Sequence, residues 1–138
     1  MVEKEVEKNL SRIKLLLIDD EEGYLNVLTK RIRRRKIDAI PAKSGYEGVE
    51  KIIKDDFDVC VLDLKMADIY GLELLKMFRL IAPQMPVIML TGHGSHYAAQ
   101  TALELGAFAY LNKPCELDEL IEIIQKACKS NKVTGLSG

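Results

Sequence analysis

Short apolar runs alternate with helix-like segments along this 138-residue chain, and that alternation constrains its fold more than any other feature. The four clearest runs are each as long as one strand: 13–18, 59–62, 87–90 and 107–111. They are apolar at consecutive positions, which is typical of strands that helices cover on both faces. A weaker strand at 38–43 contains Pro41, which cannot donate a ladder hydrogen bond, so we expect it at a sheet edge.

The segments between these runs space their apolar residues as one face of an α-helix does. Ser44 and Glu47 have the spacing of a capping box, and Gly106 stands where a helix commonly ends. Strands that alternate with helices predict a parallel sheet in an open, doubly wound α/β sandwich. The predicted buried helix positions are Tyr24, Leu25, Leu28 and Ile32; Val49, Ile52 and Ile53; Leu72, Leu75 and Phe78; and Leu117, Leu120, Ile121, Ile124 and Cys128.

The five strand–helix units occupy residues 13–129 and predict a single domain. Residues 1–12 form an N-terminal extension, in which Val2, Val6, Leu10 and Ile13 could line a short helix. Residues 130–138 read as a tail or the beginning of a linker.

Composition excludes several classes of protein. With 48% hydrophobic and 30% charged residues, the chain is neither disordered nor fibrous. A formal net charge of −1 argues against direct binding to nucleic acid, and no apolar stretch approaches the ~18 residues of a membrane span. The three cysteines have no metal-ligand spacing, so we expect reduced thiols in a cytoplasmic protein.

Polar residues stand at the carboxyl end of each central strand, where open α/β sheets bind ligands. Asp19 and Asp20 follow the first strand, Asp63 ends the third, Thr91 ends the fourth, and Lys113 follows the fifth. Like charges at short range resist joint ionisation, which leaves two solutions. One carboxyl could have a raised pKa, or a hard divalent cation such as Mg²⁺ could bind the three carboxylates. We favour the metal, because a cation and an ammonium beside a carboxylate nucleophile suit phosphoryl transfer.

In these residues the sequence resembles the receiver domains of two-component response regulators, over about residues 13–129. The matching pattern is the acidic pair Asp19 and Asp20, then Asp63, Thr91 and the Lys113-Pro114 dipeptide, each at the expected strand end. The resemblance implies a flavodoxin-like (βα)5 sandwich with a five-stranded parallel sheet in the order 2-1-3-4-5.

The resemblance also implies a role for each residue of the pattern. Asp63 would accept a phosphoryl group from a histidine kinase or a histidine phosphotransfer protein. Asp20, Asp63 and the backbone carbonyl of Lys65 would bind Mg²⁺, for which Mn²⁺ could substitute, and Asp19 would contact the metal through water. Lys113 would pair with Asp63 and then with the phosphoryl oxygens.

The remaining implied roles concern switching. Thr91 would move inward to the phosphoryl group and Tyr110 would follow, and the Lys113-Pro114 peptide bond would be cis. The switching face would comprise the fourth helix, the fifth strand and the fifth helix. That face would contact a downstream protein target, an output domain beyond this chain, or a second copy in a homodimer. Lys65 and His93 would tune dephosphorylation.

Three positions depart from the family pattern. Ala67 replaces a common proline, from which we expect a less rigid loop, and Tyr70 replaces a common acidic residue. Tyr70 is either a solvated side chain or one that packs over the site or docks a partner. Cys115 follows Pro114 where the family often has phenylalanine; its neighbours Glu116 and Asp118 would not activate a thiol, so we favour a packing role.

The sequence leaves three other functions open. A Mg²⁺-dependent phosphohydrolase would also form an aspartyl phosphate, but haloacid-dehalogenase-like enzymes need an aspartate where this chain has Lys65. Flavin binding would need a phosphate-binding loop where Asp19 and Asp20 stand. A pseudo-receiver that only binds partners is a third alternative.

The run Lys30–Lys36 is the most basic stretch of the chain. We interpret it as a solvated helix C-terminus, where cations are favourable, in preference to a dock for an acidic partner or a nucleic-acid patch. The sequence leaves open whether this receiver acts alone or within a longer regulator.

Overall fold

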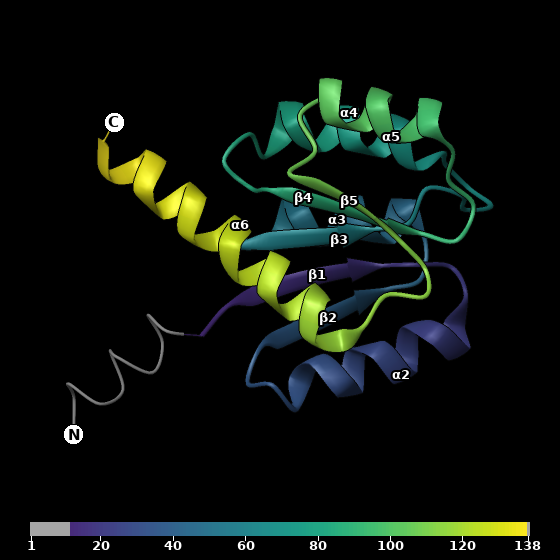
Figure 1. The fold of residues 1–138 in the computed structure, drawn as a ribbon, viewed down its shortest axis with the longest axis horizontal. Helices are drawn as coiled ribbons and strands as arrows, with labels where there is room; N and C mark the ends of the chain where they lie inside the picture. The colour runs from purple at the N-terminus through teal and green to yellow at the C-terminus, as the bar shows by residue number, and fades with distance from the viewer. Residues whose placement is uncertain (1–11, 138) are drawn as a thin grey trace.

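One parallel five-stranded sheet forms the centre of the molecule (Figure 1). This computed structural model describes residues 12–137, with side chains described for residues 12–130. The strands are β1 (Lys14–Ile18), β2 (Asp38–Ala42), β3 (Val59–Leu62), β4 (Val87–Thr91) and β5 (Ala109–Asn112). Their order, β2-β1-β3-β4-β5, confirms the predicted topology and places the strand with Pro41 at an edge.

Five helices cover the two faces of the sheet: α2 (Glu22–Arg33), α3 (Gly45–Lys54), α4 (Gly71–Ile81), α5 (His96–Glu104) and α6 (Leu117–Ser137). Helices α2 and α6 pack on one face, and α3, α4 and α5 pack on the other. Residues 130–137 continue helix α6, which extends past the sheet in Figure 1. Because a tail or a linker can begin as a helix, this continuation does not test the predicted domain boundary at residue 130, which stays a prediction. The predicted helix around Val2, Val6 and Leu10 lies outside the described residues.

Side chains of the central strands enter two separate cores because successive residues point to opposite faces. Leu15 and Leu17 of β1 join the core under α2 and α6, whereas Leu16 and Ile18 join the core under α3, α4 and α5. Strands β3 and β4 are buried along their whole length, as the consecutive apolar residues predicted. Strand β5 is only partly buried because it forms the other edge of the sheet.

Two predictions from the apolar pattern are wrong in detail. Ile53 does not face the core, because 73% of it is exposed. The buried positions of α3 are glycines instead, and a Cβ on Gly48 would lie 3.2 Å from Cγ1 of Ile18. Strand β5 begins at Ala109 and not at residue 107, because the amide of Ala107 still donates to the carbonyl of Ala102 at the end of α5 (3.0 Å).

The predicted caps lie at the beginning of α3 and at the end of α5. The hydroxyl of Ser44 accepts from the amide of Glu47 (3.1 Å), which confirms the first half of the capping box. The carboxylate of Glu47 accepts instead from the amide of Lys43, one residue before the cap (3.1 Å). Gly106 follows α5 with a φ of +100°, a conformation that favours glycine at a helix end.

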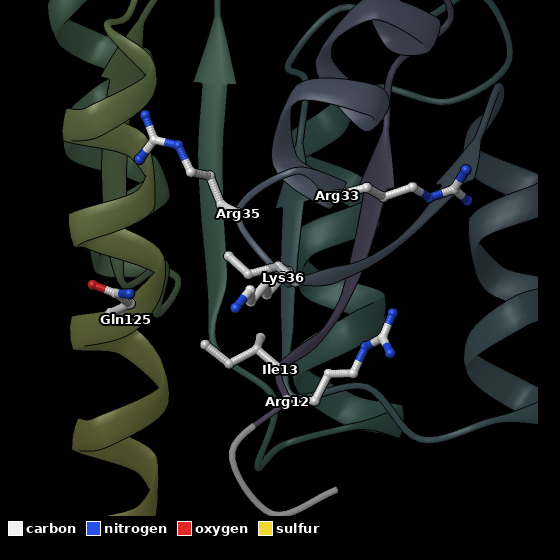
Figure 2. A pocket seen from close by; sticks show the side chains of 7 residues that line it. Arg12, Ile13, Arg33, Arg35, Lys36 and Gln125 are labelled. Atoms are coloured by element: carbon white, nitrogen blue, oxygen red, sulfur yellow. The ribbon is translucent and has the colours of Figure 1, made fainter. Parts of the chain in front are cut away.

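The basic run ends helix α2 at the amino edge of the sheet. Arg33 donates through Nε to the carbonyl of Ala39 (3.0 Å), and Arg35 pairs with Asp118 of α6. These contacts support the interpretation of the run as a helix C-terminus. The same turn borders a hollow of about 660 Å³. Figure 2 shows its labelled side chains; the lining residues are Arg12, Ile13, Arg33, Arg35, Lys36, Ile37 and Gln125.

Candidate functional site

Three carboxylates meet at the carboxyl edge of the sheet. Asp19 directly follows β1 and Asp63 directly follows β3, and both residues are buried (3% and 5% exposed). Asp20 is the most exposed of the three. Each residue offers one oxygen, and these oxygens all lie within 4.8 Å of one another. The structure therefore brings together the three carboxylates that the strand ends predicted.

Backbone hydrogen bonds hold two of these residues in place. The amide of Asp63 donates to the carbonyl of Ile18 (3.1 Å), which extends the β1–β3 ladder to the site. The carboxylate of Asp63 accepts from the amide of Leu64 (2.8 Å), and that of Asp19 accepts from the amide of Glu21 (2.9 Å). Both carboxylates therefore have a fixed orientation.

Lys113 brings a positive charge to this cluster from the loop after β5. Its Nζ lies 2.7 Å from Oδ2 of Asp19 and 3.6 Å from Oδ2 of Asp63. The same Nζ lies 4.1 Å from the ring centroid of Tyr24, a cation–π distance. The peptide bond between Lys113 and Pro114 is cis, as the resemblance implied.

Burial and charge act in opposite directions on the Asp19–Lys113 pair. Burial raises the pKa of the Asp19 carboxyl above its ordinary value, although the hydrogen bond from Lys113 acts to lower it. Desolvation acts to lower the pKa of Lys113, but the hydrogen bond to Asp19 and the charges of Asp19 and Asp63 together raise it. The ammonium therefore stays charged, and the buried carboxylate gains stability from any further cation nearby.

The predicted switch residues lie on adjacent strands. Thr91 ends β4, is fully buried, and accepts through Oγ1 from the amide of His93 (3.0 Å). Tyr110 of β5 packs against the core under α3, α4 and α5. Its hydroxyl is buried next to the backbone of Ser95, and burial raises its pKa although the Ser95 backbone acts to lower it. His93 itself is exposed and follows the strand end by two residues.

The loop from Leu64 to Tyr70 is hydrogen-bonded on two sides despite the alanine at position 67. The amide of Ala67 donates to Oδ2 of Asp20 (2.8 Å). The carboxylate of Asp68 accepts from the amides of Gly45 (3.1 Å) and Tyr46 (2.9 Å) at the beginning of α3. These contacts anchor a loop that we expected to be less rigid.

Two further loop residues were singled out in the sequence. Lys65 is exposed and lies two residues beyond Asp63. Tyr70 immediately precedes α4 and is 44% exposed, so it is neither buried over the cluster nor fully solvated.

Cys115 has the packing role that we favoured. It packs against the core under α2 and α6. Burial raises the pKa of its thiol, and the nearby carboxylates of Glu119 and Glu116 raise it further. All three cysteines are free thiols.

Three contributors to the site were missed in the sequence: the ring of Tyr24, the amide of Ala67 and the carboxylate of Asp68. Tyr24 was assigned only to a core-facing helix stripe. A backbone amide leaves no signal in side-chain patterns, and the contacts of Asp68 depend on how the loop folds. The sequence alone carried no usable sign of these three roles.

Comparison with known proteins agrees with this fold. A model of the response regulator receiver domain matches residues 15–125, so the chain belongs to that family, whose members are the receiver domains of two-component response regulators. These domains serve as signalling phosphoacceptors and generally bind Mg²⁺.

Individual relatives are regulators of greater length. The chain is 35% identical over 117 residues to the transcriptional regulatory protein GlrR of Escherichia coli strain K12, covering 85% of this chain and 26% of that protein. It is 36% identical over 120 residues to the response regulator protein PilR of Pseudomonas aeruginosa, covering 87% and 27%. The chain thus spans about a quarter of the length of the curated relatives it matches.

Two solved structures show the same architecture. A CheY-like receiver domain protein from Methanospirillum hungatei superposes with a TM-score of 0.86 at 28% identity, covering 90% of this chain and 99% of that one. A receiver domain from Clostridium thermocellum gives a TM-score of 0.84 at 33% identity, covering 88% and 98%. None of the helices in the described part of the chain has the length and apolarity that a bilayer crossing needs.

Proposed function

We propose that Asp63 accepts a phosphoryl group from a histidine kinase or a histidine phosphotransfer protein. The observation that carries this proposal is the position of its carboxylate. Asp63 is buried at the end of β3, its Oδ2 lies 3.6 Å from the Lys113 ammonium, and the carboxylates of Asp19 and Asp20 lie beside it. An ammonium in this position can stabilise the negative oxygens of a transferring phosphoryl group.

The donor set of the cluster fits a hard divalent cation. Three carboxylate oxygens within 4.8 Å of one another offer the ligands that Mg²⁺ prefers, and Mn²⁺ could take its place. Asp20, Asp63 and the backbone carbonyl of Lys65 would hold the ion directly, and Asp19 would hold it through water. The ion would neutralise charge on the phosphoryl oxygens.

We also propose that phosphorylation changes the face formed by α5, β5 and α6. Thr91 would release the amide of His93 and bind the phosphoryl group, and Tyr110 would follow into the space that Thr91 leaves. The buried hydroxyl of Tyr110 supports this role, because it makes no hydrogen bond of ordinary geometry where it lies and a new rotamer would let it gain one. Lys65 and His93 would tune the lifetime of the phosphoryl group.

The partner of the face formed by α5, β5 and α6 would be a downstream protein, an output domain or a second copy of the chain. The name of GlrR, a transcriptional regulatory protein, favours an output in transcription.

Intact-mass measurement after incubation with Mg²⁺ and acetyl phosphate tests the proposed function. We expect wild-type protein to gain the mass of one phosphoryl group and Asp63→Asn to gain none. A wild-type protein that gains no mass, or a variant that gains as much, would contradict the proposal. Steady release of phosphate from phosphate esters would instead indicate a phosphohydrolase.

A further inference from the structure

The side chains around the hollow at the amino edge of the sheet carry charge of one sign only. Four of its seven lining residues are cations and none is acidic; the cations are Arg12, Arg33, Arg35 and Lys36. They come from the segment before β1 and from the end of α2 with the turn that follows it, and Gln125 comes from α6 (Figure 2). Asp63 lies at the opposite edge of the sheet, so the proposed phosphoryl transfer does not use this hollow.

The helix cap does not need these cations. The carbonyl of Ile32 near the end of α2 accepts from the amide of Arg35 (2.9 Å). The carbonyl of Arg33 accepts from the amide of Lys36 (3.0 Å). The helix dipole explains why cations are favourable in this run, but backbone amides already satisfy these carbonyls. The charged ends of the side chains therefore stay available to another partner.

The fold holds two of the four cations in place. Nε of Arg33 donates to the carbonyl of Ala39 (3.0 Å), which leaves both terminal nitrogens of the guanidinium for a ligand. Arg35 donates through one terminal nitrogen to Asp118 of α6. Donors that are already oriented lose less conformational entropy when a ligand binds.

Arg12 and Lys36 add two cations that are not paired. Within residues 12–130, neither side chain forms a hydrogen bond or an ion pair. Lys36 also has a φ of +63°, and in the described part of the chain it is the only residue other than glycine with a positive φ. Glycine would adopt this conformation with less strain. Strain of this kind is characteristic of positions where the side chain has a function.

We propose that this hollow binds a small anion that carries two or more adjacent phosphate groups. Its volume of about 660 Å³ is in the range of small-molecule sites. Guanidinium groups bind phosphate oxygens through paired hydrogen bonds. Figure 2 shows Arg33 and Arg35 extending to opposite sides of Lys36, so their charges suit an extended polyphosphate better than a single phosphate.

The hollow also has contacts to offer an organic part of the ligand. Ile13 and Ile37 line it with apolar surface, and the amide of Gln125 can donate and accept hydrogen bonds. An inorganic polyphosphate and a nucleoside polyphosphate present the same phosphate chemistry, and titration with each compound tells them apart.

Isothermal titration of the full chain with tripolyphosphate and with ATP, both in buffer without Mg²⁺, tests the inference. We expect both compounds to bind. Tighter binding of ATP would support a nucleoside polyphosphate, and equal binding would support recognition of the phosphates alone.

Lys36→Gln should weaken the binding of both compounds by about 10-fold, because one charged hydrogen bond is lost. Arg34→Gln is the matched control. It removes the same charge from the same turn, but Arg34 does not line the hollow, so binding should stay within about twofold of wild type at physiological ionic strength.

Lys36→Gly separates binding from folding. The change relieves the positive φ, so the thermal unfolding temperature of the ligand-free protein should rise above that of wild type. Tripolyphosphate binding should nevertheless weaken by about 10-fold. A lysine that served only the fold would not give a gain in stability together with a loss of binding.

Three results would overturn the inference: no binding of either compound, equal losses in Lys36→Gln and Arg34→Gln, or binding of a hexaglutamate peptide as tight as that of tripolyphosphate. The inference does not rest on the proposed function. Asp63→Asn changes the opposite edge of the sheet and should bind both compounds as wild type does.

Discussion

At the scale of single residues, burial of Asp19 determines how the cluster responds to charge. The carboxylate is held against Asp63 in a place with little solvent, and Lys113 offsets only part of the resulting cost. The folded protein is therefore less stable without a cation than with a cation bound beside these carboxylates. The same arrangement that favours cation binding therefore lowers the free energy of unfolding of the cation-free protein.

Asp19→Asn should raise the thermal unfolding temperature at pH 7. The folded-state pKa of Asp19 is raised, so the cost of its charge is complete above that pKa and disappears as the pH falls towards the unfolded value of 3.8. Asparagine resembles the protonated form at every pH. The gain over wild type should therefore shrink between pH 7 and pH 4, as measured by calorimetry. A variant that is less stable than wild type at pH 7 would contradict this account.

Tyr24→Leu should lower the free energy of unfolding by about 0.5–2 kcal/mol, because it removes the ring that faces the Lys113 ammonium. Tyr24→Phe keeps the ring and should stay within about 0.5 kcal/mol of wild type. Urea denaturation of both variants measures the difference. Equal losses in the two variants would show that the cation–π contact contributes nothing.

At the scale of elements, the beginning of α4 restricts the backbone positions that the loop after β3 can adopt. Gly71 begins this helix directly beside the backbone of the site. A Cβ at this position would lie 2.7 Å from Cα of Leu64 and 2.8 Å from its carbonyl oxygen. Because these are backbone atoms, no side-chain rotation could relieve the clash.

Gly71→Ala should therefore destabilise the protein by about 1–3 kcal/mol and weaken Mg²⁺ binding, since the backbone beside Asp63 must shift. Gly23→Ala is the matched control. Gly23 lies in α2 with nothing within 4 Å of an added Cβ, so this change should be neutral or stabilising by up to about 1 kcal/mol. Chemical denaturation of both variants measures the effect, and similar stabilities for the two would refute it.

The sequence predicted those parts of the fold and site that depend on strand order. Asp63, Thr91 and Lys113 could be placed together because parallel strands bring their carboxyl ends to one edge. Ile53 was misplaced because glycines let α3 approach the sheet closely, which apolar spacing does not reveal. The amide of Ala67 could not be predicted, because its partner depends on the path of a loop.

At the scale of the whole molecule, the two ends of the sheet differ in the charge of the side chains that they carry. The carboxylate cluster occupies the carboxyl edge, while the hollow at Arg12, Arg33 and Lys36 lies at the amino edge. The residues under α2 and α6 and those under α3, α4 and α5 connect these ends through continuous packing. A cation bound at the carboxyl edge should therefore stabilise the entire fold.

Mg²⁺ at 100 times its dissociation constant should raise the free energy of unfolding by about 2.7 kcal/mol. Thermal unfolding at matched ionic strength measures this stabilisation. The double variant Asp20→Asn/Asp63→Asn should show almost none of it, because two of the three carboxylates are lost. Equal stabilisation of both proteins would locate the bound ion elsewhere.

The most direct test of the central claim is to locate the phosphoryl group on the chain. Borohydride reduces an aspartyl phosphate to homoserine, which marks the modified residue permanently. After incubation with Mg²⁺ and acetyl phosphate, peptide mass spectrometry should find homoserine at position 63 and aspartate at positions 19 and 20. Homoserine at position 19 or 20, or no homoserine in the chain, would contradict the assignment of Asp63 as the phosphoacceptor.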